Sequence, residues 1–258
     1  MELQYPSNFF SFSYMTTTPS TRGVWGAIAR YKDLSALAQD LVTELESGLS
    51  LLQRLPAAIT FFGGARIRPS DPYYRAAERM GELLATAGIP PRTGAGPGIM
   101  TAVPSGFHQQ LHKDGVWDGH SNGSESASHE HHERPQALTQ GFNIKLPFEQ
   151  SINPAIDVSL ELAHFPTRKL MLYANTLGIV IFPGGFGTMH QLFELLTHIE
   201  TKKMNPLPII LFGREFWQPL LEFIHTLHAN FNTISHLDEG IIKVIDEPSE
   251  LLPYLDLK

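Results

Sequence analysis

The sequence predicts an α/β protein built on a doubly wound parallel sheet with helices on both of its faces. Short, almost wholly apolar segments alternate along the chain with longer segments whose apolar residues recur every three or four positions. Continuous apolar strands are typical of parallel sheets that are buried on both faces. Glycine-rich turns follow three of the short segments, and in such sheets ligands bind beyond the carboxyl ends of the strands.

The expected elements follow in chain order. Residues 1 to about 30 show no period and are interpreted as an arm or a cap, whereas a leucine stripe predicts an amphipathic helix over residues 34–55, at Leu37, Leu41, Leu45, Leu49 and Leu52. Further helices are expected over 71–87, 167–176, 189–202 and 215–229, and strands over 57–62, 142–146, 177–182, 207–212 and 241–245. We therefore expect an N-terminal arm and helix over 1–56, packed on a single α/β domain over 57–258. The polar, histidine-rich stretch 113–136 is expected to be a mobile surface loop.

Composition excludes several classes of function. The chain has 258 residues, 42% of them hydrophobic, and a net charge of -7, which argues against nucleic acid as a partner. It contains no cysteine, so thiolate metal sites and cysteine nucleophiles are excluded. The N-terminus lacks a signal-like pattern and no stretch approaches the length of a membrane span, so we expect a cytoplasmic protein without a membrane partner.

Three glycine-rich turns indicate the ligand. They contain Gly63 and Gly64, then Gly94, Gly96 and Gly98, then Gly184, Gly185 and Gly187. Glycine lets backbone N–H groups approach a ligand closely, and two of the turns lead directly into expected helices, whose N-termini attract anions. Together they predict a phosphate-bearing ligand, although each turn taken alone is also compatible with a purely structural role. Neither the P-loop pattern nor the dinucleotide G-x-G-x-x-G spacing is present, which disfavours P-loop enzymes and dinucleotide dehydrogenases.

Four segments carry a resemblance to a known family. PGGFGTMHQ (183–191), TRKLM (167–171), GAGPGIM (94–100) and LPFEQSINPAID (146–157) resemble motifs of the Lonely Guy (LOG) family, often labelled lysine decarboxylase-like. The resemblance implies a Rossmann-like fold, a homodimer or larger assembly, and hydrolysis of the N-glycosidic bond of a nucleoside 5'-monophosphate. Decarboxylation normally requires pyridoxal phosphate bound to a lysine, and no lysine stands out here, so we expect no cofactor.

The resemblance also assigns the site residues. Arg168 is expected to orient the ribose or the phosphate, with Lys169 and Met100 nearby, and the turn from Gly184 through Phe186 to Thr188 is expected to hold the phosphate. The family has a catalytic glutamate where this chain has Gln191, which removes the negative charge. Glu194 is a possible substitute, one turn further along the expected helix.

Local patterns offer structural explanations for some of these residues. Thr188 and Gln191 form a T-x-x-Q pattern, which predicts a capping box at the start of a helix beginning at Met189. Glu194 is also compatible with a helix-surface carboxylate. A further departure from the family is Thr101, where relatives often carry a glutamate. The loop histidines have no metal-site spacing, so no metal site is expected, at His120, His129, His131 and His132.

Two functions stay open at this point. The first is a phosphoribohydrolase that cleaves AMP or a related, cytokinin-type nucleotide to free base and ribose 5-phosphate. The second is a non-catalytic protein that binds or carries a nucleotide or a phosphorylated pterin, which the loss of the glutamate at Gln191 favours. Both predict a phosphorylated small molecule as the partner.

Overall fold

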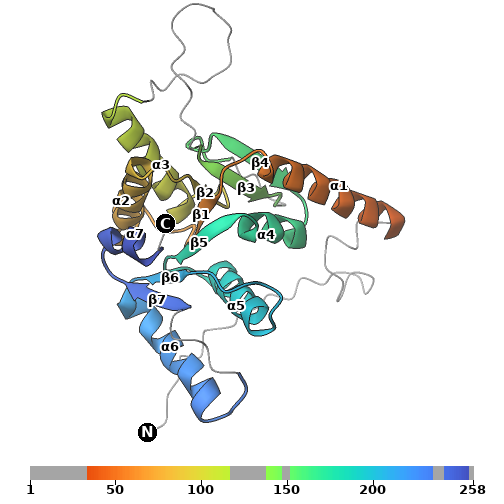
Figure 1. The fold of residues 1–258 in the computed structure, drawn as a ribbon, viewed down its shortest axis with the longest axis vertical. Coiled ribbons are helices and arrows are strands. Elements are labelled where there is room, and N and C mark those ends of the chain that lie inside the picture. Colours follow the sequence, from red (N-terminus) through yellow and green to blue (C-terminus); the bar gives the residue numbers. More distant parts are fainter. Residues whose placement is uncertain (1–33, 117–137, 147–151, 235–240, 256–258) are drawn as a thin grey trace, which may run out of the picture. The chain divides into compact units, whose positions relative to one another are not determined.

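The computed structural model describes residues 34–116, 138–146, 152–234 and 241–255 (Figure 1). The chain divides into two compact units, residues 1–43 and residues 44–258. The described residues of the first unit, 34–43, form the first part of helix α1 (Leu34–Leu52). All the other helices and strands belong to the second unit.

The second unit is built on a sheet of seven parallel strands in the order β4-β3-β2-β1-β5-β6-β7. The strands are β1 (Ala58–Phe62), β2 (Pro91–Thr93), β3 (Gln140–Ile144), β4 (Val158–Leu162), β5 (Thr176–Ile181), β6 (Ile209–Phe212) and β7 (Ile242–Ile245). From β1 the chain builds outward to β4, returns to pair β5 with β1, and then builds outward on the other side to β7. This is the doubly wound, Rossmann-like arrangement that the sequence predicts.

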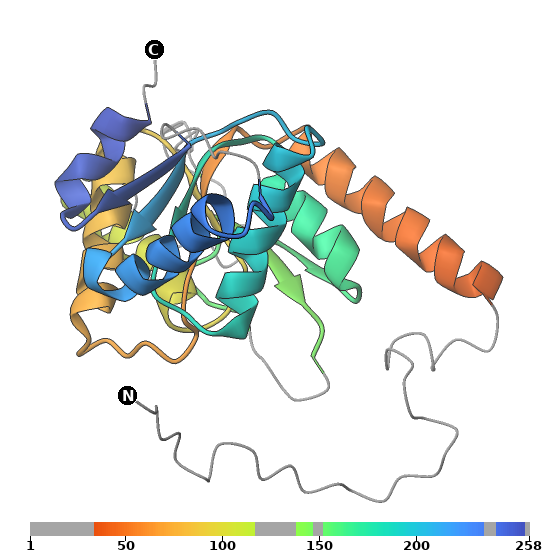
Figure 2. The ribbon, with the colours of Figure 1, turned by 90° about the horizontal axis from the view of Figure 1, so that it is seen from below.

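Helices cover both faces of the sheet (Figures 1 and 2). One face packs against α2 (Pro72–Thr86), α3 (Ile99–Lys113) and α7 (Leu251–Tyr254), and a short 3₁₀ helix (Pro248–Glu250) precedes α7. The other packs against α4 (Phe165–Tyr173), α5 (Phe186–Glu200), α6 (Arg214–Ala229) and the end of α1. Alternate strand residues face the two cores: in β5, Val180 joins the first and Ile179 and Ile181 join the second. Each central strand is therefore buried on both sides, which explains its continuous apolar sequence.

Most of the expected elements are present, with several corrections. Two strands, β2 and β4, were given no residue range by the sequence analysis, and α4 and α5 begin at Phe165 and Phe186, earlier than expected. Helix α3 runs to Lys113, and residues 117–136 of the expected loop lie outside the described residues. Within the described part of the chain, no helix combines the length and the apolar character that crossing a membrane requires.

Candidate functional site

A cavity of about 930 Å³ opens beyond the carboxyl ends of β1 and β5. These strands are neighbours in the centre of the sheet, and the chain leaves them toward opposite edges. This is the topological switch point, where doubly wound sheets bind their ligands. The lining comes from the turns after β1 and β5, from Met100 of α3, from the start of α2, and from the N-terminal parts of α4, α5 and α6. Two of the three predicted glycine turns therefore border one cavity.

The turn after β5 presents the backbone of a helix N-terminus to this cavity. Helix α5 begins at Phe186, its N-cap is Gly185, and no side chain caps its first N–H groups. Gly185 and Gly187 both have open space where a side chain would begin, whereas a Cβ on Gly184 would lie 2.1 Å from the Thr188 hydroxyl. Uncapped N–H groups and a positive helix end form a suitable site for an anion.

The predicted capping box is wrong. Thr188 is the third residue of α5 rather than its N-cap, because the helix begins at Phe186. Gln191 consequently lies in the second turn, beyond reach of the capping position, and it lines the cavity. Its side chain does not cap the start of the helix and is therefore available to a ligand.

Arg168 lies in α4, where it lines the cavity and packs against Gly94 of the second glycine turn. The side chain is only 9% exposed, and its Nε donates a 3.0 Å hydrogen bond to the carbonyl oxygen of Phe142. A Cβ on Gly94 would lie 2.0 Å from one terminal nitrogen, so the glycine makes room for the guanidinium. Burial lowers the pKa of Arg168 to about 10, and the group remains cationic at neutral pH. No described residue accepts a hydrogen bond from its terminal nitrogens, which leaves them free for a ligand.

Lys169 also lines the cavity, and it is held there by a carboxylate. Its Nζ lies 3.1 Å from Oε2 of Glu194 and 3.2 Å from Nε2 of His190. The same Glu194 oxygen accepts a 2.9 Å hydrogen bond from the Tyr173 hydroxyl, whose pKa is raised by burial and by the Glu194 charge. Glu194 itself is not among the described residues that line the cavity. The structure therefore gives Glu194 a role in orienting Lys169.

The second glycine turn mainly serves close packing. Gly98 has a φ of 71°, and a Cβ there would lie 2.2 Å from the carbonyl oxygen of Gly64. A Cβ on Gly63 would lie 2.7 Å from the side chain of Ile99. The carbonyl oxygen of Gly96 accepts a hydrogen bond from the hydroxyl of Thr101 at 3.1 Å. Of the residues predicted around this turn, Met100 lines the cavity directly, together with Gly63 and Gly64 from the turn after β1.

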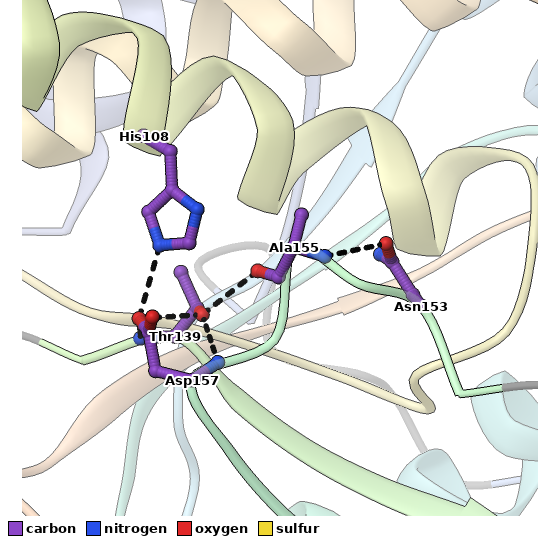
Figure 3. A network of polar contacts seen from close by, with 5 residues as sticks. All are labelled: His108, Thr139, Asn153, Ala155 and Asp157. Carbon is purple, nitrogen blue, oxygen red and sulfur yellow. Dashed lines mark hydrogen bonds and ion pairs between the residues drawn. The ribbon is translucent and has the colours of Figure 1, made fainter. Parts of the chain in front are cut away.

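A polar network links Asn153, Ala155 and Asp157, just before β4, to Thr139 and His108 (Figure 3). Asn153 donates hydrogen bonds to the carbonyl oxygens of Ala95, from its backbone, and of Met100, from its side chain, both at 3.1 Å. Ala95 replaces the middle glycine of the family pattern and has a φ of 55°, in the left-handed region. The backbone hydrogen bond from Asn153 helps to hold this strained residue in place.

The same network joins a carboxylate to a histidine. Oδ2 of Asp157 lies 3.0 Å from Nε2 of His108 and accepts hydrogen bonds from the backbone and the hydroxyl of Thr139, at 2.9 and 2.8 Å (Figure 3). Burial alone would raise the pKa of Asp157, but the contacts with His108 and Thr139 outweigh it and lower the pKa. Asp157 thereby joins α3 to the amino ends of β3 and β4.

Several cavity residues escaped the sequence analysis. They come from the loop after β1 and from the first turns of α2, α4 and α6: Arg66, Ile67, Asp71, Tyr73, Phe165 and Phe216. Among the charged ones, Arg66 adds a cation and Asp71 adds a carboxylate. The one local signal was Asp71, whose position before Pro72 is typical of a helix N-cap.

The structure adds nothing in favour of a metal centre. Among the described residues, no group of three or more histidine, aspartate or glutamate side chains is arranged to hold an ion. The loop histidines considered above lie outside the described residues.

The fold and the position of the cavity define a Rossmann-like α/β protein. The chain belongs to the family described as "Possible lysine decarboxylase", whose model matches residues 122–255, about half of its length. This confirms the family that the sequence motifs indicate.

Individual relatives show how far the similarity extends. The chain is 30% identical over 190 residues to the pyrimidine/purine nucleotide 5'-monophosphate nucleosidase of Escherichia coli strain K12, a match that covers 68% of this chain and 36% of that protein. The chain thus spans about a third of the length of the curated relatives it matches. Among solved structures, the molybdenum cofactor binding protein of Rippkaea orientalis superposes with a TM-score of 0.50 at 16% identity, covering 77% of this chain and 94% of that one. At that identity the likeness concerns the fold alone.

Proposed function

We propose that the protein hydrolyses the N-glycosidic bond of a nucleoside 5'-monophosphate, with AMP as the first substrate to test. The observation that carries the proposal is the combination, in one cavity, of the uncapped N-terminus of α5 with the cations of Arg168 and Lys169. A phosphate is the ligand group that suits both. The nucleotide nucleosidase relative supports the choice of reaction.

The chemistry assigns each group a task. The backbone N–H groups at the start of α5 bind the phosphate, and Lys169, oriented by Glu194, adds a positive charge. The terminal nitrogens of Arg168 bind the ribose hydroxyls or the phosphate as a fork. Cleavage develops positive charge on the ribose while water attacks the anomeric carbon. Gln191 can orient that water by hydrogen bonding, but an amide neither balances the charge nor takes a proton.

The neutral amide of Gln191 also favours a second function, which is binding or transport of a phosphorylated ligand without turnover. The fold is shared with a molybdenum cofactor binding protein, so a phosphorylated pterin is the alternative ligand to test. Both functions use the same phosphate site, and they differ only in whether the bound ligand is cleaved.

One experiment separates the two functions. The purified protein is incubated with AMP, GMP, CMP and UMP, and free base and ribose 5-phosphate are quantified by chromatography. The Arg168→Ala variant, purified in parallel, shows whether any release comes from a contaminating nucleosidase. Calorimetry with AMP and adenosine measures the phosphate contribution: equal affinity for the two would exclude the phosphate site. Saturable AMP binding without base release would favour the carrier.

The protein is also proposed to form a homodimer or a larger assembly. Leu170 of α4 and Phe193 of α5 are 45% and 38% exposed, and both belong to helices that contribute residues to the cavity. A contiguous apolar patch is typical of a subunit interface, and these two side chains are proposed to belong to one. Light scattering tests the proposal, and a monomer mass at micromolar concentration would contradict it.

A further inference from the structure

Hydrolysis of a glycosidic bond calls for a carboxylate, and the two expected sources in α5 do not supply one. Gln191 lines the cavity but carries no charge. Glu194 has the charge, but its Oε2 is occupied by Lys169 at 3.1 Å and by the Tyr173 hydroxyl at 2.9 Å, and it does not line the cavity. A carboxylate that already neutralises an ammonium group is a poor proton acceptor.

Among the described residues that line the cavity, Asp71 is the only one with a carboxylate. It lies at the end of the loop that follows β1, immediately before α2, and so reaches the cavity from a different part of the sequence than α4 and α5. We propose that Asp71 is the general base of the hydrolysis, taking a proton from the attacking water. This assignment rests on the proposed function.

The geometry holds Asp71 firmly and leaves one of its oxygens free. Its backbone N–H donates to the carbonyl oxygen of Arg68 at 2.9 Å, and its own carbonyl oxygen accepts from Tyr74 at 3.1 Å and from Arg75 at 3.3 Å. Oδ1 accepts the 2.8 Å N-capping hydrogen bond from the backbone of Tyr73. No described residue donates to Oδ2. One oxygen therefore fixes the side chain while the other remains available to a water molecule.

The α4 cations and the Asp71 carboxylate reach the cavity from different sides, and Arg66 adds a cation from the loop that precedes Asp71. Arg168 and Lys169 enter from α4, on the helical layer that packs against one face of the sheet, whereas Asp71 begins α2 on the opposite layer. A nucleotide whose phosphate binds at these cations and at the start of α5 would therefore have the Asp71 carboxylate on its opposite side. Among the described residues, no ion pair joins Asp71 to Arg168 or Lys169, and Lys169 pairs with Glu194 instead.

The step balances without any further reactant. A bond forms between the water oxygen and the anomeric carbon, and the bond from that carbon to the base breaks, with its electron pair passing to the base nitrogen. Oδ2 of Asp71 accepts one water proton, which then passes to the departing base or to bulk water. The products are the free base and ribose 5-phosphate.

Substitution by asparagine separates catalysis from folding. Asparagine caps a helix as well as aspartate does, so Asp71→Asn retains the hydrogen bond to Tyr73 and the stability of α2. It removes the proton acceptor, and we expect kcat for AMP to fall by about 10²–10⁴-fold, the usual contribution of a positioned acid or base. AMP affinity by calorimetry and the midpoint of thermal unfolding should remain close to those of the wild type.

Two further variants control for charge and for space. Glu215→Gln removes a neighbouring negative charge in the first turn of α6 that does not line the cavity, and its kcat should match that of the wild type. Asp71→Ser keeps a capping hydroxyl but shortens the side chain, and added formate should restore part of its activity.

The possible outcomes separate a wrong role for Asp71 from a wrong assignment of the hydrolase activity. Wild-type kcat in Asp71→Asn, or the same loss of kcat in Glu215→Gln, overturns the role of Asp71 while leaving the hydrolase intact. A fall in AMP affinity with unchanged kcat would make Asp71 a substrate-binding residue and also overturns it. A wild-type protein that releases no base from any of the four nucleotides overturns the proposed function, and the role of Asp71 with it.

Discussion

Gly94 gives a direct test of how the cavity holds its ligand. A Cβ at this position would lie 2.0 Å from a terminal nitrogen of Arg168 and 2.9 Å from Sδ of Met100. The guanidinium of a Gly94→Ala variant must therefore move, and it cannot do so without straining the 3.0 Å hydrogen bond from its Nε to Phe142. If Arg168 binds the phosphate or the ribose, its displacement removes a hydrogen bond to a charged group. Such a bond contributes about 1.5–3 kcal/mol, which corresponds to a loss of AMP affinity of roughly 10- to 150-fold.

Calorimetry measures this loss, and chemical denaturation measures stability in parallel. Gly94 has no positive φ, so the backbone accepts alanine, and the free energy of unfolding should fall by no more than about 1.5 kcal/mol, the value of the strained hydrogen bond. Gly88→Ala is the matched control: Gly88 has a φ of 69° and open space around it. We expect it to lose about 1–2 kcal/mol of stability and to keep its affinity. Unchanged AMP affinity in Gly94→Ala would refute the role of Arg168 in ligand binding.

Three further predictions concern single side chains. Gln191→Glu places a carboxylate in the cavity and should raise AMP turnover by up to about 10²–10⁴-fold, measured as base release; unchanged turnover would show that the amide does not occupy a catalytic position. Phe186 lines the cavity and is 96% exposed, so Phe186→Ala should change stability by less than about 0.5 kcal/mol. If its ring stacks on the base, the variant should weaken AMP binding by about 1–3 kcal/mol, and unaltered affinity would exclude stacking. The pKa of Asp157 is lowered on folding, so its contribution to stability is present above its unfolded pKa of about 3.9 and is lost as the pH falls through the lower folded pKa. Asp157→Asn should therefore be less stable at pH 7 and lose less stability than the wild type on acidification, and parallel denaturation curves down to pH 3 would contradict this.

The central strands and the position of the cavity were predictable because their causes are local in sequence. A parallel strand buried on both faces must be apolar throughout, as in β5 and β6. The turn after such a strand needs glycine where the chain approaches a neighbour or leaves its backbone open, and Gly184 and Gly185 provide one case of each. Both features can be recognised within a window of about ten residues, without knowledge of distant parts of the chain.

Strand β2 was not predictable, because its stability comes from distant groups. It consists of Pro91, Arg92 and Thr93, a sequence typical of a loop, yet it is fully buried. The Arg92 guanidinium donates to Oε1 of Gln140 at 2.9 and 2.8 Å and to carbonyl oxygens at the end of α4, among them that of Ala174. A buried arginine is tolerated only when such acceptors surround it, and no pattern within β2 indicates that they will be there.

The start of α5 shows how a correct pattern can give the wrong boundary. T-x-x-Q is a frequent helix beginning, but Gly185 already allows the chain to enter the helix at Phe186. A Cβ on Gly184 would clash with the Thr188 hydroxyl at 2.1 Å, so Thr188 packs over the turn from inside the helix. Tertiary packing thus decides between two local solutions, and it moves Gln191 from a capping position to the wall of the cavity.

The carboxylates of the site illustrate why helix spacing alone cannot assign a catalytic group. Glu194 follows Gln191 by three residues, which places the two on a similar face of α5. Lys169 of α4 lines the cavity and pairs with Glu194, which does not line it, so the ion pair leaves Glu194 with an orienting task. Asp71 lies more than one hundred residues earlier in the sequence, and it reaches the cavity only because the parallel sheet brings the carboxyl ends of β1 and β5 together. A carboxylate is available for proton transfer where the fold leaves an oxygen unpaired, and in the described part of this cavity that condition is met at Asp71.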